Sequence, residues 1–462
     1  MNLLRDHNHI GKILMKLDHM KKMGADKIAL LGLFALGLIL ARIIISQRVK
    51  VALTDPIKLP HTNLWVSLPT GGDWQSEKQW SRIENGFHLS SFFARGNRLV
   101  TSVECAYLLA EPETEPERLF EQRASRSKAA IAKTGRIRSR QPADALVFDW
   151  ARMTDRRKRL DVFLAVCRLP DGRQLSIKLQ QFSDDIELAE KILRKVVGSI
   201  KFQMDKRLDA GAQIVTQIKT DGLDQSLPAA TEDIYLIQSP ANEPLGFTMT
   251  TLTNVGNDAG EPNAAEATIK AADYLYIRGP LQRERLALFE GNGNLGRFNF
   301  KSESRDNTGQ RGIETTYGKN GAMAVKVAGD TRLKLYQPGP AAIPELFLNV
   351  VLNKVIETGC EEIIIDLIGP AGQITPVLIS RLNTENTILG EEDAYVFRLV
   401  LLDNRGFSQQ IHLDEQKRIS KALLNQEVTY LFERTTAEDI LKLFPERAKY
   451  IFNKNAFIEK SP

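Results

Sequence analysis

Cysteine and histidine are both scarce in this chain of 462 residues. Three cysteines cannot build the dense disulfide framework of a small secreted domain. Their odd number, without a C-x-x-C motif, argues against a redox enzyme. Among the six histidines there is no pair at the His-x-x-x-His spacing of a metal site. The sequence therefore predicts no metal centre and no cofactor.

A strong excess of charge of one sign is also absent, since the formal net charge is only +5. The hydrophobic fraction of 43% and the charged fraction of 26% are ordinary for a folded protein. These values exclude a polytopic membrane protein, a collagen and a wholly disordered chain. At about 100–200 residues per domain, the length allows two or three domains.

The chain contains one long apolar run near its start. Residues 28–41 carry no charge, Arg42 interrupts, and three isoleucines follow at 43–45. As a helix this run would extend over about 27 Å, at about 1.5 Å per residue. That length nearly matches the hydrocarbon core of a bilayer, which is about 30 Å thick. The sequence therefore predicts a transmembrane helix at 28–46 after a cytoplasmic tail at 1–27.

The flanking charges predict the orientation of this helix. More lysines precede it than basic residues follow it, which favours a cytoplasmic N-terminus; they are Lys12, Lys16, Lys21, Lys22 and Lys27 before it, and Arg48, Lys50 and Lys58 after it. We therefore expect a single-pass inner-membrane protein with its bulk in the periplasm. A buried helix of a globular domain and a cleaved signal peptide are the alternatives, although no A-x-A cleavage site follows the run.

A first folded domain is predicted at 56–204. Asp171-Gly172 stands between two alternating segments and indicates a β-hairpin turn. Thr114, Pro116 and Glu117 indicate a helix start. A final helix follows Asp185, with one apolar face made by Ile186, Ala189, Ile192, Leu193 and Val196. The pattern predicts an α/β domain with an antiparallel sheet.

Two short segments at the ends of this domain carry a family resemblance. Ser67-Leu68-Pro69, with Trp74 shortly after, resembles the first strand of PsbP-like and DcrB-like domains. Residues 196–202, which read VVGSIKF, resemble the end of their last helix. The resemblance covers about a third of the chain and implies an accessory or binding module. It supplies no catalytic residues.

Basic residues concentrate in the first domain. Between Arg118 and Arg168 there are fourteen Lys and Arg residues against five Asp and Glu residues. The sequence RRKR at 156–159 is predicted to form the tip of a hairpin. A solvated charged face is one interpretation of this excess. The other is a docking patch for an anionic partner, made by Arg136, Arg138, Arg140, Arg156, Arg157, Lys158 and Arg159. No nucleic-acid partner is expected, because aromatic residues are not interleaved with these charges.

The second half of the chain has the pattern of many short strands. We expect a linker at 205–231 with at most one short helix, a β-rich domain at 232–452 and a tail at 453–462. Helices are predicted from Pro344 to Glu357, at 414–424 and at 437–443. Many antiparallel strands around one central helix look like the half-barrel of the LolA and LolB lipoprotein carriers. The predicted fold class is therefore α+β, with a transmembrane helix, a PsbP-like α/β domain and a curved sheet wrapped on a helix.

Several motifs lead to no site. Gly291 to Gly296 satisfies G-x-G-x-x-G, but an alternating segment follows where a dinucleotide site needs a helix, so a hairpin turn is expected. Asp366 lies in an apolar strand, where an edge position or a hydrogen bond explains it better than catalysis. Cys105 and Cys167 fall in two predicted strands, and a disulfide between them is one possibility.

These observations predict a membrane-anchored, extracytoplasmic binding protein without enzymatic activity. Its ligand would be lipid-like, or its partner an envelope protein. One alternative is a structural or assembly component of an envelope complex. The other is a hydrolase with an unrecognised site. The sequence assigns no catalytic, cofactor-binding or metal-binding residue.

Overall fold

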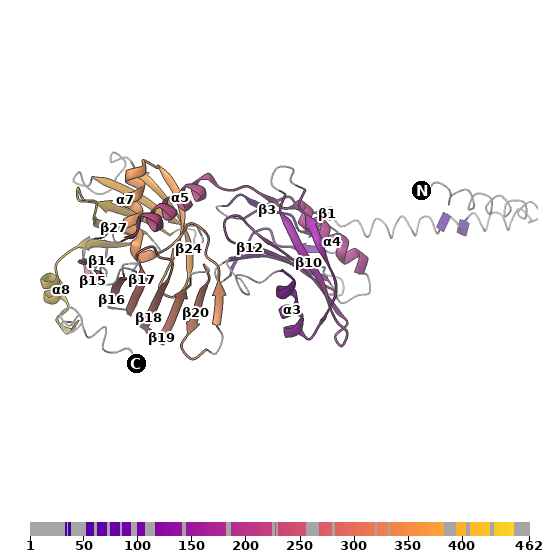
Figure 1. The fold of residues 1–462 in the computed structure, drawn as a ribbon, viewed down its shortest axis with the longest axis horizontal. Helices are drawn as coiled ribbons and strands as arrows, with labels where there is room; N and C mark the ends of the chain where they lie inside the picture. Colours follow the sequence, from indigo (N-terminus) through magenta and orange to yellow (C-terminus); the bar gives the residue numbers. More distant parts are fainter. Residues whose placement is uncertain are drawn as a thin grey trace, which may run out of the picture.

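The computed structural model shows two β-sheet domains side by side (Figure 1). It describes residues 33–34, 36–37, 52–59, 62–71, 74–83, 86–93, 99–106, 116–140, 145–181, 186–223, 227, 230–255, 268–279, 282–318, 321–330, 333–382, 394–402, 407–425 and 429–447. Of these residues, 54% lie in strands and 22% in helices. The predicted α+β fold class is therefore wrong, and the protein is mostly β. The few helices cover or fill the sheets and do not form layers of their own.

A membrane-spanning helix is not found among the residues that the structure describes. A span needs about 20 apolar residues in one helix, whereas the longest described helix has 16 residues. This finding overturns the prediction of a single-pass inner-membrane protein with a periplasmic bulk. Within the predicted segment 28–46, residues 33–34 and 36–37 are described, and they are helical and exposed. The rest of that segment, and both predicted tails, lie outside the described residues.

The first domain is built on an eight-stranded antiparallel sheet. Its order is β5-β7-β8-β12-β11-β10-β9, with β6 also paired to β7. The strands are β5 (Trp74–Ser76), β6 (Ser81–Ile83), β7 (Gly86–Phe93), β8 (Leu99–Ala106), β9 (Ala130–Arg138), β10 (Val147–Asp155), β11 (Leu160–Arg168) and β12 (Gln174–Gln181). Gly172 has a φ of 89° in the β11–β12 turn, and residues 156–159 form the β10–β11 turn. Both predicted hairpin turns are therefore confirmed.

Two helices pack on opposite faces of this sheet. α4 (Ile186–Ser199) buries the apolar face predicted for it, including Ala189, Ile192 and Val196, in a core with Phe148 and other side chains of the sheet. α3 (Pro116–Ser127) buries Leu119, Phe120 and Ala124 against the other face. Proline fits the first turn of α3 because its missing N–H has no helical partner there.

Two small sheets close the α4 side of the first domain. They are formed by β1 (Ala52–Leu53) with β4 (Pro69–Thr70), and by β2 (Ile57–Lys58), β3 (Leu64–Val66) and β13 (Lys201–Phe202). The Ser67 N–H donates to Ser199 Oγ at 3.1 Å. The two segments that carry the family resemblance therefore lie together in space.

The second domain contains one sheet of fifteen strands. Its order is β21-β20-β19-β18-β17-β16-β15-β14-β28-β27-β26-β25-β24-β23-β22, and only the last pair is parallel. The strands are β14 (Ala230–Gln238), β15 (Pro244–Val255), β16 (Thr268–Ile277), β17 (Arg283–Asn292), β18 (Phe298–Asp306), β19 (Gly309–Tyr317), β20 (Met323–Val327), β21 (Leu333–Tyr336), β22 (Ala342–Pro344), β23 (Glu362–Ile368), β24 (Ile374–Leu382), β25 (Tyr395–Leu401), β26 (Ser408–Leu413), β27 (Ile419–Asn425) and β28 (Thr429–Arg434). Residues 291–296 lie in the β17–β18 hairpin, as predicted.

This sheet curls until its two ends meet. Gly372 in the β23–β24 turn packs so closely on Val325 of β20 that a methyl group at Gly372 would clash with that side chain. The concave face holds α5 (Lys206–Asp221), the short helix η1 (Glu345–Phe347) and α7 (Leu348–Thr358), which share an apolar core with the strands. α8 (Ala437–Leu443) and η3 (Pro445–Arg447) follow β28, and α8 covers part of the outer face near Phe247 and Tyr274.

Two segments of the second half differ from their predictions. Residues 205–231, expected as a linker, contain α5, whose Ile214, Val215 and Ile218 enter the core of the large sheet. Residues 414–424, expected as a helix, form a tight turn followed by β27. In each case a partner distant in the sequence decides the outcome. β23 supplies the groove for α5, and β26 and β28 pair with β27.

Candidate functional site

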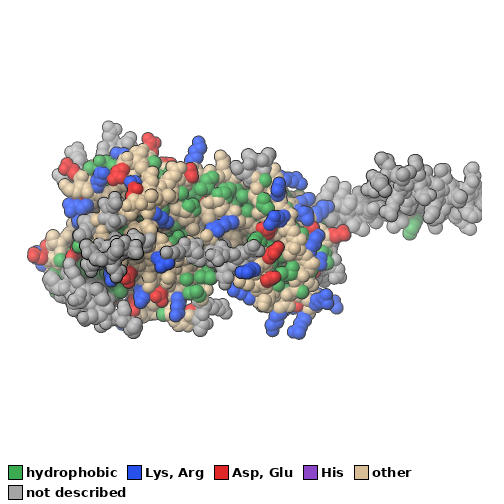
Figure 2. Space-filling view, viewed as in Figure 1, with side chains coloured by type: hydrophobic (Ala, Val, Ile, Leu, Met, Phe, Trp, Pro, Cys, Tyr) green, Lys and Arg blue, Asp and Glu red, His purple; other side chains and the backbone are tan. Residues whose placement is uncertain are grey.

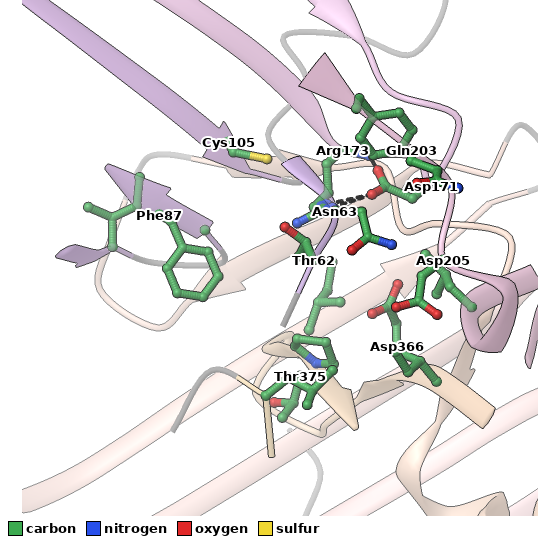
Figure 3. A pocket seen from close by; sticks show the side chains of 18 of the residues that line it. Thr62, Asn63, Phe87, Cys105, Asp171, Arg173, Gln203, Asp205, Asp366 and Thr375 are labelled. Carbon is green, nitrogen blue, oxygen red and sulfur yellow. Dashed lines mark hydrogen bonds and ion pairs between the residues drawn. The ribbon is translucent and has the colours of Figure 1, made fainter. Parts of the chain in front are cut away.

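A pocket of about 80 Å³ lies at the junction between the two domains (Figure 3). The first domain contributes Thr62, Asn63, Phe87, Cys105 and the β11–β12 turn. The second contributes the start of α5 and the β23–β24 hairpin, including Asp366 and Thr375. Such a volume holds several water molecules or a small organic group. The pocket exists only when both domains are present and in contact.

The β11–β12 turn provides a buried ion pair at the centre of the pocket. The Arg173 guanidinium donates through Nε to Asp171 Oδ2 at 2.9 Å and contacts the same oxygen through Nη2. Asp171 Oδ1 also accepts from the Arg173 N–H at 3.1 Å. Asp171 and Arg173 are 1% and 7% exposed. A buried ion pair with such hydrogen bonds is held in one geometry.

Two glycines bring this turn against the second domain. Gly172 meets Gly339 so closely that a Cβ on Gly172 would lie 2.6 Å from the Gly339 Cα. A Cβ on Gly339 would collide with the Asp171 carbonyl and would lie 3.2 Å from Asp366 Oδ2. The absence of both side chains therefore lets the β11–β12 turn pack directly on the backbone at Gly339, beside Asp366.

The N-terminus of α5 forms another side of the pocket. Asp205 caps the helix by accepting from the Arg207 N–H at 3.0 Å. It also accepts from the Arg207 guanidinium at 3.1 Å and 2.8 Å. These hydrogen bonds hold the pKa of Asp205 below its usual value. Asp205 is therefore an ionised carboxylate that is already engaged within its own helix start.

Asp366 and three polar side chains complete the lining. Asp366 on β23 is 1% exposed, and its N–H donates to the Ala341 carbonyl at 3.0 Å. In Figure 3 it lies near Asp205, with Thr375 nearby. Among the described residues, the side chains of Asn63, Gln203 and Thr375 make no hydrogen bond. Their amide and hydroxyl groups can therefore donate to and accept from a bound molecule.

The opposite side of the pocket is apolar and leads outward. Cys105 is fully buried, and burial raises the pKa of its thiol to about 11. Phe87 and Leu402 line both the pocket and a broader neighbouring groove of about 1150 Å³. Trp74 and Trp80 also line that groove. The two cavities adjoin at Phe87 and Leu402.

The structure divides the predicted basic patch into two groups. Arg136, Arg138 and Arg140 lie on β9 and just after it, whereas residues 156–159 lie at the tip of the β10–β11 hairpin. The hairpin tip is next to the start of β9, so about 26 Å of strand separates it from Arg138. All seven side chains are exposed. Lys and Arg side chains are frequent on the face of the first domain seen in Figure 2.

The disulfide considered between Cys105 and Cys167 is absent. Cys105 on β8 and Cys167 on β11 both pair with Leu175 of β12, which lies between them. Cysteines two strands apart are separated by about 10 Å, beyond the limit of about 7 Å between the Cα atoms of a disulfide. All three cysteines are free.

Comparison with known proteins gives no family assignment. No family model matches the chain, and no curated protein matches it. One similar solved structure is a β-barrel-like protein of a domain of unknown function, DUF1849, from Brucella abortus. Its TM-score is 0.32 and its sequence identity 9%, and the match covers 44% of this chain and 95% of that one.

The pocket offers hydrogen-bonding groups to a bound molecule. No group of three or more metal-ligating side chains occurs among the residues described in the structure. Sequence reasoning had singled out Asp366 and the Asp171-Gly172 turn, although as structural features. It missed Asp205, Arg173 and Thr375. Asp205 carries a readable signal, because an Asp before an apolar helical pattern is a typical N-cap. No local pattern indicates that these residues meet.

Proposed function

We propose that this chain is a non-catalytic binding protein whose ligand occupies the junction pocket. The observation that carries the proposal is the lining itself, since both domains contribute polar side chains to one small pocket. Ligand pockets combine apolar walls with a few polar groups that orient the ligand, and they occur preferentially between domains. Phe87, Ile374 and Pro376 supply the apolar walls here.

The ligand class follows from the donors and acceptors that face the pocket. Asn63, Gln203 and Thr375 offer both kinds of group, while Asp171 and Asp205 are already paired with arginines. Three carboxylates and one arginine line the pocket, and Arg207 also pairs with Asp205, so the lining has no excess of positive charge to attract an anionic ligand. We therefore propose a small neutral or cationic polar molecule, such as an amide, a polyol or an amine.

The predicted lipid-like ligand is not part of this proposal. In the half-barrel carriers that the second domain was expected to resemble, the concave face of the sheet would hold an acyl chain. Here, Phe289, Phe300 and Phe347 pack together on that face, with α5 and α7. An apolar core occupies the place where an acyl chain would lie.

The direct test is a ligand-observed NMR screen of the full chain against small amides, polyols, amines and carboxylic acids. We expect amides, polyols or amines to bind and carboxylic acids to bind worse. Thr375→Leu removes a hydroxyl and fills space in the pocket, so it should weaken binding about tenfold, or about 1.4 kcal/mol. The matched control is Thr251→Leu on β15, a half-buried threonine of the same sheet outside the pocket.

Three results would contradict the proposal. Absence of any binder would leave the junction as a structural contact, as expected for an assembly component. Equal weakening by Thr375→Leu and Thr251→Leu would place the ligand elsewhere. Conversion of a bound molecule to product, followed in the same NMR samples, would make the protein an enzyme.

A further inference from the structure

Strand β9 is a free edge of the eight-stranded sheet. It stands last in the strand order and pairs with β10 on one side, and no other described strand pairs with it. An edge strand presents a row of unpaired N–H and C=O groups that can pair with another chain. At the opposite end of the sheet, β5 and β6 pair along the same side of β7 and form two edge strands of only three residues each.

β9 is also unusually open. Eight of its nine residues are exposed, and only Ile137 is buried. An edge strand with one face on a core would show alternating burial. Gly135 is the exception, because the indole of Trp150 on β10 would lie 2.9 Å from a Cβ at this position. An incoming strand would therefore meet little steric hindrance along most of β9.

The charges along β9 favour an acidic partner strand. Arg136 and Arg138 lie on the same face of the strand, two residues or about 7 Å apart. Asp149 on β10 accepts from Arg136 Nε at 2.8 Å, which holds that side chain on this face. Arg138 has no ion-pair partner among the described residues. A neighbouring strand with acidic residues at alternate positions would place its carboxylates opposite both arginines.

We propose that β9 is a docking strand for an extended acidic segment of another protein. The segment adds to the sheet beside β9 through backbone hydrogen bonds, and Asp or Glu residues at positions i and i+2 face Arg136 and Arg138. This is the strand-addition mode of peptide recognition, in which the backbone gives affinity and alternate side chains give specificity. The site is separate from the junction pocket and does not depend on it.

The distance between the two basic groups allows a peptide to be distinguished from a long polyanion as the partner. Residues 156–159 lie about 26 Å from Arg138 along the strand, so a short strand opposite Arg136 and Arg138 does not need them. A nucleic acid or an anionic membrane would contact both groups of charges. Substitutions in the two groups can therefore distinguish a short acidic peptide, which needs only Arg136 and Arg138, from a nucleic acid or a membrane, which needs both groups.

The test is fluorescence anisotropy with a labelled nine-residue peptide that alternates Glu with Val and Thr, titrated with the full chain. We expect saturable binding that is lost when Lys replaces every Glu. Arg138→Glu should weaken binding roughly tenfold. Arg157→Glu, which makes the same charge change at the hairpin tip, should weaken it less than about twofold. Equal loss in the two variants would show general electrostatic attraction and overturn the proposal.

Backbone pairing is tested with N-methylated peptides. Only alternate amides of an added strand face β9, so N-methylation of one alternate set should abolish binding and N-methylation of the other set should not. Hydrogen exchange of residues 130–138 should slow when the unmodified peptide binds, with little change in α4. Identical binding of both methylated peptides would contradict strand addition. Absence of peptide binding would mean that the arginines serve only to keep edges of separate molecules apart.

Discussion

The two sheets of this protein treat their edges differently. The first domain has an open sheet with α3 and α4 on opposite faces, and its strand β9 has a free side. The sheet of the second domain curls around α5 and α7 until the β23–β24 turn contacts β19 and β20. Among the described strands, β21 and β22 at the ends of the second sheet also have one partner each, but the curl brings these ends together over one core.

The two domains therefore differ in where substitutions should have their effect. The second domain is a curled sheet whose core depends on close packing between helix and sheet. The first domain presents an exposed basic strand on one side and contributes the β11–β12 turn to the junction pocket. Variants that disturb the inner packing should therefore affect the second domain most, and surface changes should act on the first.

The largest effect is expected from Gly211→Ala in α5. The added methyl group would run into the backbone carbonyl of Ile364 on β23, where no side chain can move aside. Overpacking of this kind costs about 3 kcal/mol or more, despite the better helix propensity of alanine. Urea unfolding of the full chain should show a lower midpoint for this variant.

Gly198→Ala in α4 is the matched control. Its methyl group would lie 3.4 Å from Arg140 Nε, at the end of a flexible side chain. The change in free energy of unfolding should stay within about 1 kcal/mol. Equal destabilisation by the two variants would mean that α5 has no special packing in the second domain.

A smaller effect on stability is expected from the protonation of Glu345, at the start of η1. Burial raises the pKa of this carboxyl to about 7, against a partly offsetting attraction to Arg285, whose Nη1 is 3.7 Å away. Asp273 also faces Arg285, with a distance of 2.6 Å to Nη2. Because the folded state holds a proton that the unfolded chain releases, Glu345 stabilises the fold at low pH. This contribution is lost as the pH rises through 7.

The measurement is urea unfolding of the native protein and of Glu345→Gln between pH 5 and pH 8. The difference in stability between them should change over this range, with the native protein losing more stability as the pH rises. Parallel curves would show that Glu345 does not take up a proton on folding.

The smallest effect concerns the cysteines and needs no mutation. Cys105 and Cys167 are buried in the first domain, and burial raises the pKa of Cys167 to about 12. Cys360 in the second domain is only half-buried. We expect one thiol to react with a disulfide reagent in the folded protein and all three to react after unfolding. If fewer than three thiols react after unfolding without reductant, a disulfide is present.

Local patterns predicted several elements well. The apolar face of α4, the Asp171-Gly172 turn and the limits of α8 are confirmed, and α7 ends one residue beyond the predicted Glu357. Each depends on residues within one or two turns of each other, such as a helical apolar stripe or a glycine with positive φ. The helix predicted at 414–424 failed because its apolar residues suit a strand once β26 and β28 lie beside it.

The candidate site could not be predicted from local sequence patterns. Asp171, Asp205 and Asp366 come from a hairpin turn, a helix cap and an apolar strand, and the chain brings them to one pocket only through contact of the two domains. The membrane-spanning prediction used only hydropathy, and no described helix supports it.

By itself, the sequence determined the β-rich character of the second half, the principal turns and the basic excess of the first domain, because these depend on composition and short-range spacing. Tertiary structure alone decided that α5 is core, that Cys105 and Cys167 stay apart, that β9 is a free edge and that one pocket joins the domains. These depend on which strands and helices become neighbours, and pairing between distant segments is set by the packing of the whole chain.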